Sequence, residues 1–238
     1  SFSAMTDAFI ACRELSNPCA TAEPRAAQPA RIRLLLCLLL VAPYFAASQA
    51  LAQQQEPSPR VNRVAAVGGF VGGMVVGLLA HEGGHLFFDV VFDADPGIKR
   101  VEFKGIPFFA ITHRPDLSPR QEFTISSAGF WVQSATNEWL LTTRPRLRHE
   151  HAPFAKGVFA FNIGTSAMYS VAAFAQAGPP ERDTRGMAES SGIDEAWIGA
   201  IVLAPAVFDT WRYFDPHSRW AVWLSRAAKI GSVLLVLR

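Results

Sequence analysis

The residues with the clearest capacity for chemistry are His81, Glu82 and His85, in the sequence HEGGH. Residues four apart lie on one face of a helix, so both imidazoles can bind the same Zn²⁺ ion. Glu82 then lies beside the ion, where its carboxylate can take a proton from zinc-bound water. The alternative is a polar helix end among lipid headgroups. Three ionisable groups at the end of an apolar run are costly unless they have a function, which favours the zinc site.

The chain offers few other kinds of zinc ligand. Its three cysteines, Cys12, Cys19 and Cys37, all lie in the first fifth of the sequence. An odd, clustered set is not typical of a disulfide framework or of a thiolate zinc site. If the front of the chain is removed, any metal must be held by His, Asp or Glu. A catalytic zinc ion has three protein ligands and an open position for water, so a third ligand is needed besides the two histidines.

The HEGGH motif follows a run without charge, residues 64–80, and the apolar stretch is long enough to span a bilayer. Its glycines fall four apart, a spacing that lets membrane helices approach closely: Gly68/Gly72, Gly69/Gly73 and Gly73/Gly77. Further apolar segments are 123–141, 154–177, 193–208 and a weaker one, 221–237, that could instead lie in the membrane interface. We therefore expect an all-α fold, a polytopic transmembrane helix bundle of about four to five spans.

A small β-hairpin is expected after the HExxH helix, within the polar residues 93–121. Residues 101–104 alternate apolar and charged, and residues 108–112 form a second β-prone run. Gly105-Ile106-Pro107 between them is typical of a turn. The hairpin is expected to lie outside the hydrocarbon, where its edge could pair with an extended substrate strand.

The composition agrees with a membrane protein. Half of the residues are hydrophobic and only 18% are charged, whereas soluble domains have about 25% charged residues. The formal net charge of +2 argues against a nucleic-acid partner, which would require a basic patch. The expected partner surface is therefore the lipid bilayer.

The first part of the chain is typical of a targeting sequence. Arg31 and Arg33 precede an apolar run, residues 34–47, and Ala50-Leu51-Ala52 matches a signal-peptidase site. We expect residues 1–52 to be a polar leader plus signal peptide, or an uncleaved signal anchor. Residues 53–63 would be a linker, and residues 64–238 a membrane-embedded metallopeptidase-like domain.

With these motifs, the sequence resembles the site-2-protease family of intramembrane zinc metallopeptidases, from about residue 64 to about residue 210. That family carries HExxH on a transmembrane helix, then a β-hairpin, then a helix with the motif A-G-P-x-x-N. Here Ala128 and Gly129 match, Phe130 stands in place of Pro, and Gln133 stands in place of Asn. Gln133 keeps an amide that could hold the substrate backbone, or it could form a helix–helix hydrogen bond.

The resemblance implies an intramembrane zinc metalloprotease with a Zn²⁺ cofactor. Glu82 would be the catalytic base, and His81 and His85 would be zinc ligands. The substrate would be a membrane protein or peptide, hydrolysed in or near the membrane. The implied location is the bacterial inner (plasma) membrane.

For the third ligand, the family usually uses an Asp from an N-x-x-P…L-D-G segment. Here Asn162 is present, but no Pro or Asp-Gly follows at the expected spacing. Divergent relatives place the Asp just past the Asn-bearing helix, which favours Asp183. Topology agrees, because the second span leads away from the HEGGH face and the third returns to it. Asp209 and Glu138 remain rival third ligands.

Two other functions stay open. The protein could be a non-proteolytic membrane scaffold that retains a zinc site or its relic, or a zinc hydrolase with a lipid-like or small-molecule substrate. The membrane orientation is also open. A signal peptide would turn the HEGGH end to the cytoplasm, whereas the arginine-rich loop 144–148 would then lie outside, against the positive-inside rule.

Overall fold

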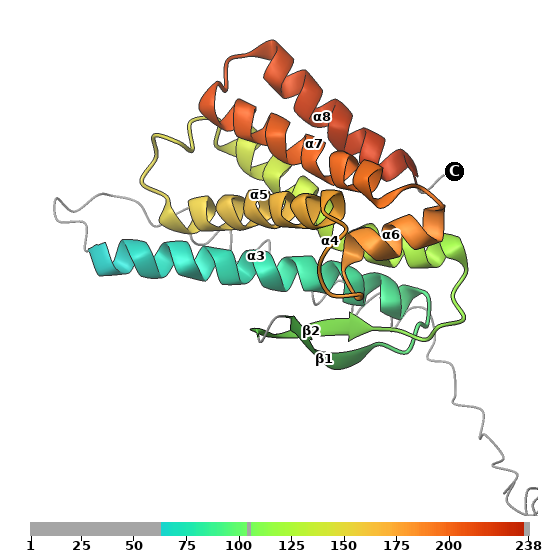
Figure 1. The fold of residues 1–238 in the computed structure, drawn as a ribbon. Coiled ribbons are helices and arrows are strands. Elements are labelled where there is room, and N and C mark those ends of the chain that lie inside the picture. The colour runs from blue at the N-terminus through green and yellow to red at the C-terminus, as the bar shows by residue number, and fades with distance from the viewer. Residues whose placement is uncertain (1–62, 104–105, 236–238) are drawn as a thin grey trace, which may run out of the picture.

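The protein is mostly helical, with one small antiparallel sheet (Figure 1). The structure, a computed structural model, describes residues 63–103 and 106–235. The described helices are α3 (Arg63–Val91), α4 (Pro119–Thr143), α5 (Pro153–Phe174), α6 (Asp183–Ser191), α7 (Glu195–Phe214) and α8 (Arg219–Leu234). The strands are β1 (Gly97–Phe103) and β2 (Ile106–Thr112). The predicted leader, the signal peptide and nearly all of the linker lie outside the described residues.

Each of the five predicted apolar segments corresponds to one long helix. α3, α4, α5, α7 and α8 run back and forth along roughly one direction, and short α6 lies at the end of the bundle where α3 finishes (Figure 1). The sequence analysis did not predict α6. This helix begins at Asp183 and ends where Gly192 takes a left-handed conformation, with φ of 69°. Glycine adopts that conformation without steric cost, so it ends the helix.

Polar caps begin the two helices that start at the HEGGH end, α4 and α7. The hydroxyl of Ser118 accepts a hydrogen bond from the backbone N–H of Gln121, and the Gln121 side chain accepts one from the backbone N–H of Ser118. This capping box, with Pro119 in the first turn, starts α4. Asp194 caps α7 in a similar way, by accepting from the backbone of Ala196. These caps place the starts of α4 and α7 beside α6.

The predicted hairpin is confirmed, with Val101 opposite Phe108 and Gly97 opposite Thr112. The predicted turn was too long. Ile106 pairs with Phe103 and Pro107 with Glu102, so both residues belong to β2. Only residues 104 and 105 connect the strands, and these lie outside the described residues. The hairpin lies along the C-terminal half of α3 (Figure 1).

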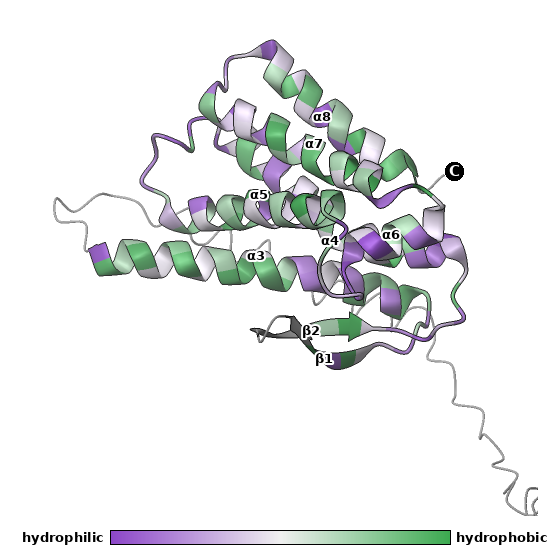
Figure 2. Cartoon of the chain, in the orientation of Figure 1, coloured by the Kyte–Doolittle hydropathy of each residue, from purple (hydrophilic) through white to green (hydrophobic). Residues whose placement is uncertain are grey.

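Two of the described helices, α3 and α5, are long and apolar enough to cross a membrane. Figure 2 shows hydrophobic residues along most of α3 and hydrophilic residues on α6 and the connecting loops. The count of about four to five spans is therefore not established by length and composition alone.

α7 and α8 have an inverted distribution of polar side chains. Their outer surfaces expose large apolar residues: Trp197, Val207, Trp211, Phe214, Trp220, Trp223, Ile230 and Val233. Their inner surfaces bury Asp209, Arg212, Ser225 and Lys229. A helix in water shows the opposite arrangement, with apolar side chains inside and charges outside.

Small residues bring α3 and α5 into close contact. A Cβ atom on Gly73 would overlap the backbone of Phe154 and stand 2.9 Å from the Val158 nitrogen. A Cβ atom on Gly157 of α5 would likewise overlap the carbonyl group of Phe70. By contrast, a Cβ on Gly72 would meet no atom within 4 Å. Of the predicted glycine pairs, Gly69/Gly73 and Gly73/Gly77 therefore serve this packing, whereas Gly68/Gly72 does not.

We expect Gly73→Ala to destabilise the protein by about 2 kcal/mol, and to lower its melting temperature in detergent by roughly 5 °C, because the backbones must separate. Gly72→Ala is the matched control and should leave the melting temperature unchanged or slightly raised. Equal melting temperatures for the two variants would contradict this packing.

Candidate metal centre

Two helices, α3 and α6, bring the predicted ligands His81, His85 and Asp183 to one point. His81 and His85 lie on the inner face of α3, 2% and 5% exposed. Asp183 is the first residue of α6. One nitrogen from each histidine and one carboxylate oxygen lie within 4.8 Å of one another. Among the residues that the structure describes, this is the one group of three His, Cys, Asp or Glu side chains so arranged.

The spacing of these atoms fits a tetrahedral metal site. The Asp183 Oδ2 atom is 3.1 Å from His81 Nε2 and 3.4 Å from His85 Nε2. The two Nε2 atoms are 3.3 Å apart. A tetrahedral zinc ion with ligand bonds of about 2.0–2.1 Å separates its ligand atoms by about 3.3 Å. The three atoms therefore form one face of a tetrahedron of the right size, and the residues fit a zinc ion.

α4 orients the two imidazoles. The Nδ1–H of His85 donates to the carbonyl oxygen of Ile125 at 2.7 Å, which directs Nε2 toward His81 and Asp183. A backbone partner on the far ring nitrogen is typical of zinc-binding histidines. The His81 ring lies against Gly129, where an added Cβ would stand 2.7 Å from Nε2. Gly129, which matches the family motif, is therefore required for His81 to occupy this position.

Contacts around the start of α6 hold Asp183 in place. The preceding residue, Arg182, donates from Nε and from an Nη atom to the two carboxylate oxygens of Glu195, each at 2.6 Å. The Thr184 hydroxyl donates to Glu195 at 2.9 Å. Both neighbours of Asp183 are thereby attached to the first turn of α7. Burial alone would raise the pKa of Asp183, but His85 and His81 outweigh burial and hold that pKa below its ordinary value.

Glu82 and Gln133 have different surroundings. Glu82 interacts electrostatically with both histidines and with Asp183, as a base beside the metal must. Gln133 is buried between α4 and α5, where its side-chain oxygen accepts a hydrogen bond of 3.5 Å from the Ser166 hydroxyl. Its amide nitrogen has no hydrogen-bond partner among the described residues. A substrate-binding role for Gln133 stays a prediction.

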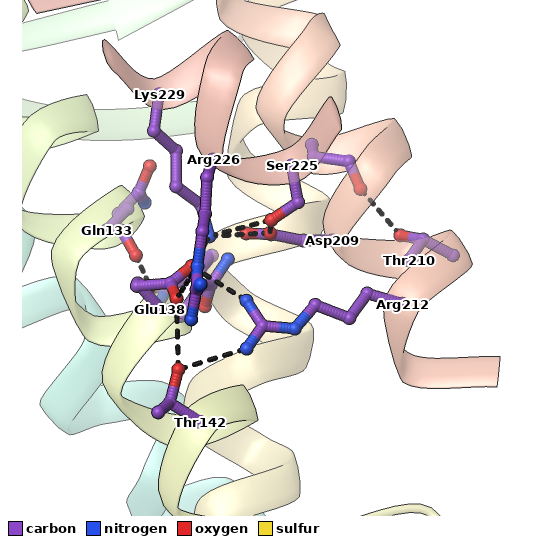
Figure 3. Close-up of polar contacts among 12 residues, drawn as sticks. Gln133, Glu138, Thr142, Asp209, Thr210, Arg212, Ser225, Arg226 and Lys229 are labelled. Atoms are coloured by element: carbon purple, nitrogen blue, oxygen red, sulfur yellow. Dashed lines mark hydrogen bonds and ion pairs between the residues drawn. The ribbon is translucent and has the colours of Figure 1, made fainter. Parts of the chain in front are cut away.

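The rival acids Glu138 and Asp209 belong to a separate charged cluster between α4, α7 and α8 (Figure 3). Glu138 accepts from Arg212 at 2.7 Å, from Arg226 at 2.9 Å and from Lys229 at 3.0 Å. Asp209 accepts from Ser225 at 2.6 Å and pairs with Lys229 at 2.7 Å. Three cations thus surround two carboxylates, and neither acid lies with the two histidines. This cluster holds the polar inner face of α8 against the bundle.

We expect Glu138→Gln to destabilise the protein by about 2 kcal/mol while leaving the zinc content unchanged, because the buried cations Arg212 and Lys229 would lose this carboxylate. Thermal unfolding in detergent and metal analysis measure the two effects. Glu189→Gln, in an exposed pair with Arg185, is the control and should cost less than about 0.5 kcal/mol. Loss of zinc from Glu138→Gln would instead restore Glu138 as a ligand.

His113 is partly buried, with 19% of its side chain exposed. It follows β2 and lies between two carboxylates: its Nε2 is 2.7 Å from Glu122, and its Nδ1 is 3.5 Å from the fully buried Asp89. Asp89 lies one helical turn beyond His85, and Glu122 lies in the first turn of α4. Contacts with Asp89 and Glu122 raise the pKa of His113 to about 9. His113 therefore attaches the end of the hairpin to both helices that shape the metal site.

The contacts of His113 with Asp89 and Glu122, here called the His113 clasp, predict a stability difference at alkaline pH. While Asp89 and Glu122 are ionised, charged His113 contributes stability that is complete below its unfolded pKa of about 6.5 and is lost as the pH rises through about 9. Between pH 7 and pH 10, the wild type should lose about 2 kcal/mol more stability than His113→Gln. Melting temperatures of both proteins across this range test the prediction. His149→Gln, at an exposed position, should behave like the wild type.

The sequence analysis also missed Tyr169 of α5, whose ring centroid lies 6.1 Å from that of His81. Helical periodicity marks residues on one face of α5, but it does not show that this face meets His81. Asp89 had a signal, since it continues the four-residue spacing of His81 and His85.

Comparison with protein-family models, with curated proteins and with solved structures gives no match to this chain.

Proposed function

We propose that this protein is an intramembrane zinc metalloprotease that resembles the site-2-protease family. One observation carries the proposal: two histidines of an HExxH helix and a carboxylate from a distant helix present three ligand atoms 3.1–3.4 Å apart. Glu82 lies next to His81 in the chain, as the general base of HExxH peptidases does. Two buried imidazoles and a partly buried carboxylate at one point mark a candidate functional site, and their spacing suits a metal ion.

His81, His85 and Asp183 would hold the zinc ion, which when bound supplies a Lewis acid to polarise the scissile carbonyl and activate water. The Glu82 carboxylate takes a proton from the attacking water as the new carbon–oxygen bond forms. Glu82 then returns the proton to the amide nitrogen as the carbon–nitrogen bond breaks, so that an acid and an amine leave. Asp183 and the two histidines stay fixed, because α4 and α7 hold them from outside the site.

The proposal includes embedding of the bundle in a bilayer. α3 and α5 are suited to cross it by length and hydropathy. The outer faces of α7 and α8 carry exposed tryptophans and aliphatic side chains, whereas Asp209, Arg212 and Lys229 are turned inward, which suits contact with lipid. We propose that α3, α4, α5, α7 and α8 are the spans, in the inner membrane of a bacterium.

A peptide substrate has to be extended at the site, because a helical amide is shielded by its own hydrogen bonds. The hairpin lies along the HEGGH half of α3 (Figure 1). Its β1 strand is joined to the segment before Asp183 by an ion pair of 2.6 Å between Lys99 and Glu181. An edge of this sheet can hold an extended strand through backbone hydrogen bonds.

The test is zinc content and peptidase activity of detergent-purified protein. The wild type is expected to hold one zinc ion per chain and to cleave a transmembrane peptide substrate. Glu82→Gln should keep the zinc and lose activity by about 10²–10⁴-fold, because it removes the base while leaving the three ligands. Asp183→Ala and His81→Ala should lose the zinc, whereas Asp209→Ala should keep it.

The variants also separate the alternatives. If the wild type binds zinc but cleaves no faster than Glu82→Gln, the protein is better explained as a non-proteolytic membrane scaffold that retains a zinc site. The departures from the family motif at Phe130 and Gln133 would then reflect lost catalysis. A wild type that takes up no zinc after reconstitution would contradict the proposal altogether.

A further inference from the structure

The metal site has one polar neighbour that the proposed mechanism does not use. Tyr169 lies on α5, and its ring is tilted by 33° against the ring of His81, with the centroids 6.1 Å apart. Phe130 of α4 packs edge-on against both, 5.4 Å from His81 and 5.3 Å from Tyr169. Tyr169 is therefore held between the helix that carries the histidines and the helix that carries Gly129.

Tyr169 lies close to the acidic groups of the site. Its ring faces that of His81, whose Nε2 is 3.1 Å from Asp183 Oδ2, and its phenol interacts electrostatically with Asp183 and Glu82. A phenol in such surroundings needs a hydrogen-bond partner, and a carboxylate is a strong acceptor. Asp183 has two carboxylate oxygens, of which Oδ2 faces the histidines. The remaining acceptor capacity of the carboxylate is available to the phenol.

We infer that Tyr169 is a positioning residue that donates its hydroxyl hydrogen to Asp183 and holds this carboxylate in the orientation for metal binding. The inference rests on the proposed zinc site and adds a residue to it. It also gives Phe130 a role. Phe130 stands where the resembled family has Pro, and here its ring supports the rings of both Tyr169 and His81. Hydrogen bonds of this kind set the orientation and basicity of metal ligands, and their loss typically weakens binding by about 10–100-fold.

The experiment measures zinc affinity in detergent, by competition with a fluorescent chelator, for the wild type and Tyr169→Phe. The variant keeps the ring and its contacts with His81 and Phe130 and loses one hydroxyl. It should bind zinc about tenfold more weakly or worse. Tyr213→Phe is the matched control, because Tyr213 stacks on Phe159 of α5 and takes no part in the ligand group. It should bind as the wild type does.

A double-mutant cycle with Asp183→Asn separates positioning from a general loss of structure. If Tyr169 acts through Asp183, the Tyr169→Phe change should alter zinc affinity by less than about twofold on the Asp183→Asn background. The absorption spectrum of the cobalt(II)-substituted protein should also change in Tyr169→Phe and not in Tyr213→Phe.

Wild-type affinity in Tyr169→Phe, or an undiminished effect on the Asp183→Asn background, would overturn the inference and leave the proposed function intact. A wild type that binds neither zinc nor cobalt would overturn both, so the two failures are distinguishable.

Discussion

The structure depends on the convergence of two imidazoles and one carboxylate inside a helix bundle with an apolar exterior. Ligand atoms 3.1–3.4 Å apart cannot be held by one helix alone, because Asp183 comes from a different part of the chain. α4 must come close enough for Ile125 to accept from His85 and for Gly129 to meet His81. α6 must start where Asp183 reaches both rings. The contact of Gly129 with His81 and the attachment of Arg182 and Thr184 to Glu195 hold these residues in position.

Polar groups in this bundle are concentrated in a few compensated places. One is the candidate metal site, another is the His113 clasp, and a third is the cluster around Glu138 and Asp209 (Figure 3). At the candidate metal site a carboxylate faces two imidazoles, and in the other two places opposite charges face each other, as is expected where unpaired charges would be costly. The separation also divides their roles. The Glu138 cluster attaches α8 to the bundle, whereas the His81 site has Glu82 beside it, the residue that we propose as the base.

Departures from the resembled family motif are accommodated in the surroundings of the site. Phe130, in place of Pro, packs its ring on His81 and Tyr169. Asp183 approaches from the start of a short helix that the sequence pattern did not reveal. These substitutions leave the three-ligand geometry intact.

Sequence alone determined the parts of this protein that depend on local spacing. Helical periodicity put His81 and His85 on one face with Glu82 between them, apolar runs predicted the long helices, and alternation predicted the hairpin. Asp183 was favoured by the family resemblance and by the number of crossings predicted between it and HEGGH. Tertiary structure decided what depends on pairs distant in the chain. Glu138, Asp209, His113 and Tyr169 have ordinary sequence surroundings, and their partners lie on other helices. The physical reason is that a side chain's role here is set by the charge it faces, and the packing of backbones at positions such as Gly73 and Gly129 decides which charges meet.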